Sequence, residues 1–164
     1  MKTIYLVRHA KAGSGSAHTG DFNRKLNEVG LKAAHFMAEL LEERSTRPDL
    51  VLASPATRAM STAEIFCDIL DYPRERIEDR MEIYEGGAGR LLTILQHVAD
   101  INNTVLLFGH NPTITSFSNL LAGDNLDSIA TCGVVKIDCA IESWRDVSPG
   151  IGKLVWYEFP KKYQ

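Results

Sequence analysis

Three short and unbroken apolar runs stand out along the chain. They cover residues 3–7, 50–53 and 105–108. Continuous apolar runs of this length are typical of parallel β-strands that are buried on both faces of a sheet. We therefore expect three central strands, each of which ends where polar residues resume.

Helical spacing of apolar residues fills the segments between and after these runs. In each segment the apolar side chains recur on one face and charged residues mostly on the other. The predicted helices cover residues 27–44, 54–70, 90–99 and 111–121. Two of them are expected to begin at a cap followed by proline, at Ser54-Pro55 and at Asn111-Pro112, because serine and asparagine cap helices and proline suits the first helical position.

The remaining segments complete a predicted α/β fold. Residues 133–141 and 153–159 are β-rich and are separated by Pro149-Gly150, which predicts an antiparallel pair. Residues 11–20 are rich in glycine and serine and predict a loop, and residues 81–89 predict an irregular segment. The alternation predicts a single domain over 1–164, a three-layer α/β/α sandwich with a mostly parallel central sheet and helices on both faces.

The composition of the chain limits the classes of partner that it can bind. A chain of 164 residues with 45% apolar residues can bury a core of its own. The net charge of -3 argues against bulk attraction to nucleic acid or to an anionic membrane, so any anion site must be local. The three cysteines form no CxxC motif, and no stretch approaches the roughly 20 apolar residues of a membrane span. With no signal-peptide pattern, we expect a cytoplasmic protein with reduced thiols.

Residues of types that can hold phosphate follow each of the three predicted strands. Arg8 and His9 come directly after the first run, Arg58 follows the second, and His110 follows the third. Ligands of open α/β sheets bind just beyond the carboxyl ends of the strands. Each residue alone would also suit an exposed or structural position, but together they predict a pocket for a dianionic phosphate, with Lys11 adding charge at its rim.

This set of side chains suits phosphoryl transfer. A neutral imidazole can attack phosphorus in line and form a phosphohistidine, while arginines and a second histidine stabilise the equatorial oxygens. The sequence shows no evident carboxylate cluster for a metal, and we expect no cofactor. A leaving alkoxide would need a general acid, for which Glu82 and Glu85 are the candidates and Asp21 and His18 the alternatives.

Five short motifs in order resemble those of a known family. Arg8-His9-Ala10 is similar to an Arg-His-Gly signature. The other matching segments are residues 21–30, 52–64, 109–112 and 130–134. Together they resemble the histidine phosphatase superfamily, which has a phosphoglycerate-mutase-like fold, and more narrowly its small bacterial SixA-type phosphohistidine phosphatase branch.

The resemblance implies a role for each matching residue. His9 would be the phosphorylated nucleophile, Arg8 and Arg58 would bind phosphate, and His110 would be the second histidine of the pocket. It also implies that the acid, where one exists, lies on the segment 83–85. The sequence departs from the usual pattern at Ala10, where glycine is usual, and at Lys25, where proline is typical.

The leading hypothesis is a metal-independent phosphatase that works through phospho-His9 and removes phosphate from phosphohistidine on a protein. No large insertion that could form a lid is evident. The alternatives are a small-molecule phosphomonoesterase, a phosphoglycerate-mutase-type transferase acting on a small phosphorylated metabolite, and a phosphate-binding module without turnover.

Overall fold

The computed structural model describes residues 1–15 and 19–164. Within this part of the chain the strands form one six-stranded sheet in the order β3-β2-β4-β1-β5-β6. Their bounds are β1 (Lys2–Arg8), β2 (Leu50–Ala53), β3 (Glu78–Asp79), β4 (Thr104–Gly109), β5 (Val134–Cys139) and β6 (Gly152–Glu158). Neighbouring strands from β3 to β1 are parallel, whereas β5 is antiparallel to both β1 and β6.

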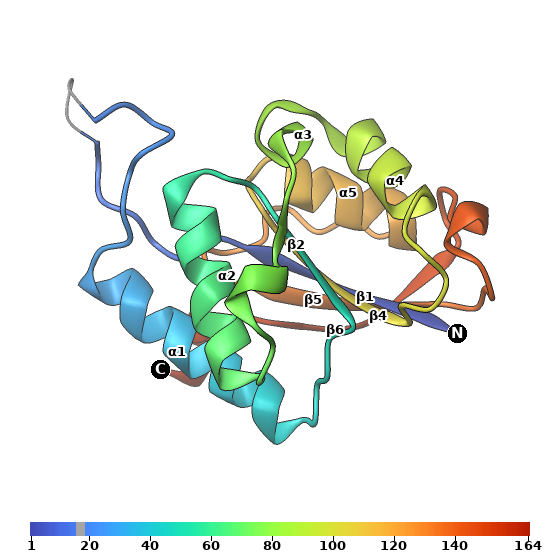
Figure 1. The fold of residues 1–164 in the computed structure, drawn as a ribbon, viewed down its shortest axis with the longest axis horizontal. Helices are drawn as coiled ribbons and strands as arrows, with labels where there is room; N and C mark the ends of the chain where they lie inside the picture. Colours follow the sequence, from blue (N-terminus) through green and yellow to red (C-terminus); the bar gives the residue numbers. More distant parts are fainter. Residues whose placement is uncertain (16–18) are drawn as a thin grey trace.

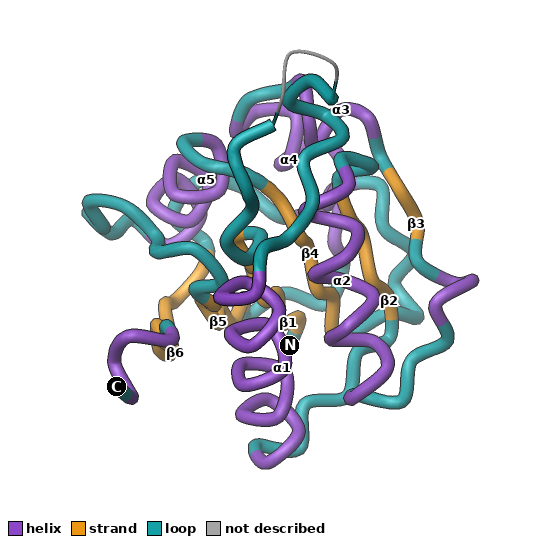
Figure 2. The backbone as a smooth tube through the Cα atoms, turned by 90° about the vertical axis from the view of Figure 1, so that its left-hand side faces the viewer, coloured by secondary structure: helices purple, strands orange, loops and turns teal. Residues whose placement is uncertain are grey.

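Helices cover both faces of this sheet. The helices are α1 (Glu28–Glu43), α2 (Thr57–Ile69), α3 (Met81–Glu85), α4 (Ala88–Gln96) and α5 (Thr113–Ala122), with short 3-10 turns η1 (Arg74–Arg76), η2 (Trp144–Asp146) and η3 (Pro160–Tyr163). Helices α1 and α2 lie side by side against one face, and α4 and α5 pack against the other (Figures 1 and 2). The predicted α/β sandwich with a mostly parallel sheet is confirmed.

The core explains why the strand sequences are apolar without interruption. Along β1, Ile4 and Leu6 belong to the cluster that includes α4 and α5, whereas Tyr5 and Val7 belong to the cluster that includes α1 and α2. Side chains alternate between the faces of a strand, so a strand covered on both sides needs an apolar residue at every position.

Most of the predicted elements form within a residue or two of their expected bounds. The three apolar runs are β1, β2 and β4, and the two late runs are the antiparallel pair β5 and β6. Asn27 caps α1 by accepting a hydrogen bond from the Gly30 amide at 2.8 Å. Asn111 also accepts from the Thr115 amide at 3.3 Å, but α5 begins at Thr113 with Pro112 as its cap residue, so the prediction that Asn111 is the N-cap is wrong.

Three further expectations need correction or restriction. Helix α2 begins at Thr57 with Ala56 as its cap residue, so Ser54 is not its N-cap. The segment predicted to be irregular contains the short helix α3 and the start of α4. The predicted loop over 11–20 includes residues 16–18, which lie outside the described residues. None of the helices in the described ranges has the length and apolar character needed to cross a bilayer.

Candidate active site

A cavity of about 640 Å³ opens at the carboxyl ends of β1 and β4. It brings together the predicted residues Arg8, His9, Lys11, Arg58 and His110. The other described residues that line it are Ala12, Asp21, Arg24, Tyr84, Asn111 and Thr131. The predicted convergence of these residues is confirmed, because the ends of parallel strands that are far apart in the chain meet at one edge of the sheet.

The backbone of His9 is fixed from several sides. Its amide donates to the carbonyl of Gly109 at 3.0 Å, and its carbonyl accepts from the amide of Cys132 at 3.0 Å. The next amide, that of Ala10, donates to the hydroxyl of Thr62 on α2 at 3.0 Å. The imidazole therefore starts from a backbone held between β4, α2 and the segment before β5.

The side chain of His9 is oriented by its own main chain. Its Nδ1 lies 2.7 Å from the carbonyl oxygen of Ala10. A carbonyl only accepts, so Nδ1 carries the proton and the lone pair of the neutral ring is on Nε2. Burial, together with the charges of the nearby Arg58 and Arg8, lowers the pKa of His9 to about 4. At neutral pH the ring is neutral, with a free electron pair on Nε2.

Arg58 extends from the first turn of α2 into the cavity. Its Nε lies 3.4 Å from Nε2 of His9, and its Nη1 donates to the main-chain carbonyl of Asp21 at 2.7 Å. Its Nη2 also pairs with the Asp21 carboxylate at 3.0 Å. The side chain is buried. The guanidinium is therefore fixed beside the imidazole rather than free to move in solvent.

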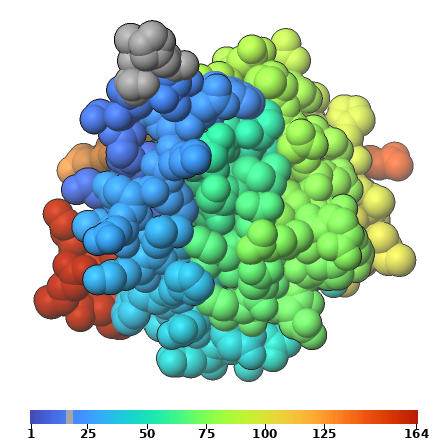
Figure 3. Space-filling view, turned by 60° about the vertical axis from the view of Figure 1, so that its left-hand side comes forward, coloured from blue at the N-terminus to red at the C-terminus, as the bar shows by residue number. Residues whose placement is uncertain are grey.

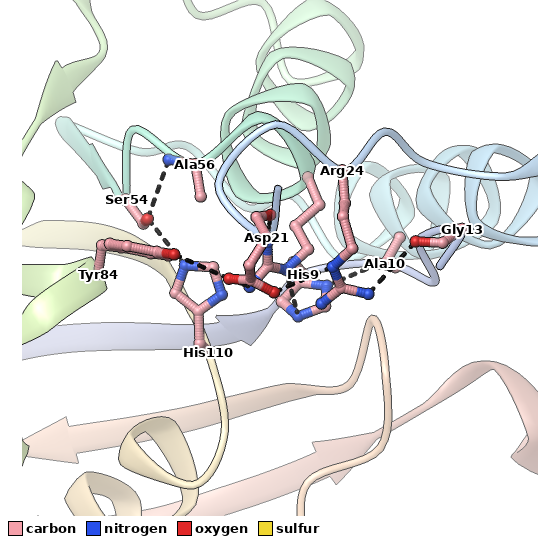
Figure 4. A network of polar contacts seen from close by, with 10 residues as sticks. His9, Ala10, Gly13, Asp21, Arg24, Ser54, Ala56, Tyr84 and His110 are labelled. Atoms are coloured by element: carbon pink, nitrogen blue, oxygen red, sulfur yellow. Dashed lines mark hydrogen bonds and ion pairs between the residues drawn. The ribbon is translucent and has the colours of Figure 1, made fainter. Parts of the chain in front are cut away.

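Asp21 is the acceptor at the centre of a polar network (Figure 4). Its carboxylate accepts hydrogen bonds from Tyr84 at 2.8 Å and from Arg24 at 3.0 Å, in addition to the pair with Arg58. The Tyr84 hydrogen bond, followed by those of Arg58 and the charges of Arg58 and Arg24, lowers the pKa of Asp21 to about 2. This carboxylate is ionised at neutral pH and carries no proton to donate.

His110 faces His9 across the cavity, with the two ring centroids 5.2 Å apart. Its Nε2 lies 2.8 Å from the hydroxyl oxygen of Ser54, and that oxygen accepts a hydrogen bond from the amide of Ala56 at 3.2 Å. Burial, with the proximity of His9 and Arg58, lowers the pKa of His110 to about 3. Its Nδ1 is buried and has no hydrogen-bond partner in the described part of the chain.

Arg8 contributes a second guanidinium at the end of β1. Its Nη1 donates to the carbonyl of Ile129 at 2.8 Å, while its Nε is buried without a partner among the residues described. A buried donor without an acceptor is costly unless a ligand satisfies it. Four cationic side chains and one carboxylate are among the described residues that line the cavity, so its charge favours an anion.

The four predicted candidates for the general acid do not all lie in the cavity. Glu82 and Glu85 are exposed on α3 and are not among the residues that line the cavity. The short helix turns Ile83 into the core and Tyr84 toward Asp21, so it presents a phenol to the cavity where the sequence suggested a carboxylate. Asp21 does line the cavity, and His18 lies outside the described residues. Among the residues described, no cluster of three histidine, cysteine or acidic side chains suits a metal ion.

Sequence reasoning missed three side chains of this network. Arg24 lies three residues after Asp21, in a motif that the resemblance singled out, but no role was assigned to it. Tyr84 reaches the cavity only because α3 packs beside β4. Ser54 has the residue type and position of a helix cap, and nothing local indicates that its hydroxyl contacts His110 instead.

Comparison with known proteins gives a consistent result. A model of the histidine phosphatase superfamily (branch 1) matches residues 4–91. An uncharacterized protein of Mycobacterium tuberculosis is 27% identical over 94% of this chain and 100% of its own length.

Solved structures agree over nearly the whole chain. A protein from Agrobacterium tumefaciens assigned as the phosphohistidine phosphatase SixA is 27% identical, with a TM-score of 0.82, over 97% of this chain and 98% of the other. A protein histidine phosphatase SixA complexed with tungstate has a TM-score of 0.85 at 24% identity, over 99% of both chains, and so supports the fold. The family match covers more than half of the sequence and includes the cavity residues Arg8, His9 and Arg58. This chain belongs to the histidine phosphatase superfamily.

Proposed function

We propose that this chain is a phosphatase that transfers a phosphoryl group first to Nε2 of His9 and then to water, and that its substrate is phosphohistidine on a protein. The observation that carries the proposal is the contact between Nδ1 of His9 and the Ala10 carbonyl at 2.7 Å. This contact fixes the tautomer whose free electron pair is on Nε2, the nitrogen beside Arg58. A neutral and oriented imidazole is a competent nucleophile toward phosphorus.

The proposed reaction has two steps. In the first, the lone pair of Nε2 attacks phosphorus, an N–P bond forms, and the P–N bond to the substrate imidazole breaks. The substrate ring, which carries a proton on its other nitrogen, keeps that electron pair and leaves as a neutral imidazole. In the second, water attacks the phosphorus of phospho-His9, inorganic phosphate leaves, and Nε2 regains its electron pair.

Cationic side chains are positioned to stabilise the charge that develops in both steps. Arg8 and Arg58 flank His9, and Lys11 and Arg24 line the same cavity. Fixed donors aimed at developing charge lower a barrier more than mobile ones, because they need no reorganisation during the reaction. His110 lines the same cavity, with its ring centroid 5.2 Å from that of His9. These cations allow the reaction to proceed without a metal ion.

The protonation states favour a phosphohistidine substrate over an alkyl phosphate. An alkoxide leaving group needs a proton donor, whereas the imidazole of phosphohistidine departs more readily. Asp21 is held ionised, and Glu82 and Glu85 do not line the cavity. The described lining of the site contains no protonated carboxylic acid, and it is therefore better suited to the substrate that does not need one.

The comparisons support the same choice of substrate. The similar protein from Agrobacterium tumefaciens is assigned as a phosphohistidine phosphatase. The SixA structure solved with tungstate shows that a protein of this fold accommodates a tetrahedral oxyanion. Tungstate resembles phosphate in shape and charge, which agrees with the anion that the cavity's cations would attract.

A substrate panel tests the proposal. The purified protein is assayed for release of inorganic phosphate from a phosphohistidine peptide, from sugar phosphates and from phosphoglycerates. We expect the highest kcat/KM with the phosphohistidine peptide. A higher kcat/KM with any phosphate ester would contradict the assigned substrate, and phosphate binding without turnover of any compound would contradict the proposed catalysis.

A further inference from the structure

A groove of about 740 Å³ continues from the active-site cavity along the surface. It lies between α1 and η3, and it shares Arg8, Lys11 and Thr131 with the cavity. In Figure 3 the C-terminal residues, in red, lie beside the blue segment that contains α1. The groove therefore begins where the phosphoryl group would be held and extends toward the C-terminal turn.

Apolar side chains line this groove although they are exposed to solvent. Val29 on α1 is 59% exposed, Phe36 is 41% exposed, and Tyr163 on η3 is 45% exposed. Ala33 lies on the same stretch of α1 and also lines the groove. Large apolar side chains gathered in one exposed patch are typical of binding surfaces, whereas scattered ones are not.

Positive charge accompanies the apolar lining. Lys11, Lys32 and Lys161 are the lysines among the lining residues, and no acidic side chain occurs among the described residues of the lining. The chain as a whole carries a net charge of -3, so this concentration of lysines is a local feature. A positive and partly apolar groove is complementary to a segment that carries acidic and apolar side chains.

The wall formed by η3 is held in place by a buried carboxylate. Glu158, at the end of β6, is buried and accepts hydrogen bonds from the Tyr163 hydroxyl and from Lys162. Arg44 at the end of α1 pairs with the same carboxylate at 3.0 Å. The rings of Phe36 and Tyr163 are 5.4 Å apart. The groove is therefore formed before any partner binds, which lowers the entropic cost of binding.

We propose that this groove binds the polypeptide segment next to the phosphohistidine of a protein substrate. Apolar side chains of that segment would lie on Val29, Phe36 and Tyr163, and its acidic side chains would face the lysines. The inference rests on the proposed function and deepens it. The phosphoryl group occupies the cavity alone, so a small phosphorylated metabolite would leave the groove empty. A protein substrate is longer, and its chain would pass Arg8 and Lys11, which line both the cavity and the groove.

Three probes distinguish the groove from the catalytic site. Two synthetic peptides of equal length carry one central histidine that is phosphorylated chemically with phosphoramidate. One has leucine and glutamate on both sides of this histidine, and the other has serine and glycine. The third probe is phosphohistidine as the free amino acid, which is too small to reach the groove. We expect kcat/KM for the leucine-glutamate peptide to exceed that for the serine-glycine peptide by about tenfold, because it gains apolar and charge contacts.

Variants on α1 then locate the effect. Phe36→Ala and Lys32→Glu are each expected to lower kcat/KM for the leucine-glutamate peptide by about fivefold, through KM, since removing one contact of an interface has an effect of this size. Hydrolysis of the free amino acid is expected to stay within about twofold, because neither residue lines the catalytic cavity. The matched controls are Leu31→Ala, at an exposed apolar residue of α1 outside the groove, and Lys153→Glu on β6. Both should leave kcat/KM unchanged for the leucine-glutamate peptide and for free phosphohistidine.

The outcomes separate the two proposals. Equal kcat/KM for the two peptides, or variants that affect free phosphohistidine as much as the peptide, would overturn the groove while leaving the phosphohistidine substrate intact. Hydrolysis of phosphate esters without hydrolysis of any of the three probes would overturn the proposed function, and the groove assignment with it. An effect of Phe36→Ala and Lys32→Glu confined to the leucine-glutamate peptide supports both.

Discussion

The Nε of Arg58 lies 3.4 Å from the Nε2 of His9. The guanidinium is thus beside the ring nitrogen that carries the free electron pair, and it is held there by two contacts with Asp21. A phosphoryl group bonded to Nε2 would have its oxygens within reach of this cation. The relationship links α2 to the end of β1, and several predictions depend on it.

Arg58→Ala should lower kcat/KM for a phosphohistidine peptide by at least about tenfold. It removes a charge-assisted contact worth roughly 1.5–3 kcal/mol in the transition state. Arg58→Lys should recover only part of the loss, because lysine keeps the charge but lacks the planar fork that holds two oxygens. Steady-state assays compare both with Arg47→Ala, which removes an exposed arginine. An unchanged rate in Arg58→Ala would place this residue outside the transition state.

Stability should fall as the pH is lowered from about 6.5 toward about 4. The folded protein holds the pKa of His9 at about 4 and that of His110 at about 3, whereas both are near 6.5 when unfolded. Between these values the unfolded chain binds more protons, so the free energy of unfolding rises with pH by about 1.4 kcal/mol per pH unit for each histidine.

Denaturant titrations from pH 7 to pH 4 measure this dependence. His9→Gln should reduce the slope, since one of the two groups is then absent. His97→Gln, at an exposed position after α4, serves as the control and should leave the slope as it is. A slope that is the same in wild type and in His9→Gln would contradict a buried neutral His9.

Tyr84→Phe should raise the pKa of Asp21 above its value of about 2. The hydrogen bond from the Tyr84 hydroxyl is the largest cause of the low pKa, ahead of Arg58 and Arg24. Carbon-detected NMR of the aspartate carboxyl groups follows this titration directly. Tyr72→Phe, whose hydroxyl contacts Arg76 instead, is the matched control. If the Asp21 titration does not move in Tyr84→Phe, the hydrogen bond does not determine its charge.

Gly30→Ala should destabilise the fold and disturb the active site together. A Cβ at this position would lie 2.0 Å from the carbonyl oxygen of Lys11, which is too close for any real contact. Either α1 or the segment after His9 must shift, at a cost of about 1–3 kcal/mol or more.

Gly89→Ala is the matched control for Gly30→Ala. This glycine lies in α4 with open space around its Cβ position, so alanine should stabilise the helix by about 0.5–1 kcal/mol. Chemical denaturation and kcat/KM report on both variants. An unaltered stability in Gly30→Ala would show that α1 does not approach Lys11 this closely.

The central cavity residues could be predicted from the sequence because each follows a recognisable strand. Arg8 ends β1, His9 directly follows it, and His110 follows β4, so one topological rule brings them together. Arg58 lies on the first turn of the helix after β2, where the same rule places it. The start of α1 was also predictable, since Asn27 caps its own helix through a local hydrogen bond.

The rest of the network depends on tertiary packing that no local pattern reveals. Tyr84 reaches Asp21 because Ile83, beside it on α3, is buried near Gly109, where an added Cβ would lie 3.2 Å from the Ile83 side chain. Ser54 suits a helix cap as well as a partner for His110, and only the approach of β4 decides between the two. The direction of α3 likewise leaves Glu82 and Glu85 outside the cavity.

The position of the phosphoryl group on the enzyme tests the account most directly. The protein is mixed with a radiolabelled phosphohistidine peptide, quenched in alkaline detergent during turnover, and the labelled residue is identified by peptide mapping and phosphorus NMR. The account predicts acid-labile label on Nε2 of His9, its loss in His9→Gln, and its retention in His35→Gln, which alters an exposed histidine of α1. Label on Nδ1 or on another residue, or full turnover by His9→Gln, would contradict it.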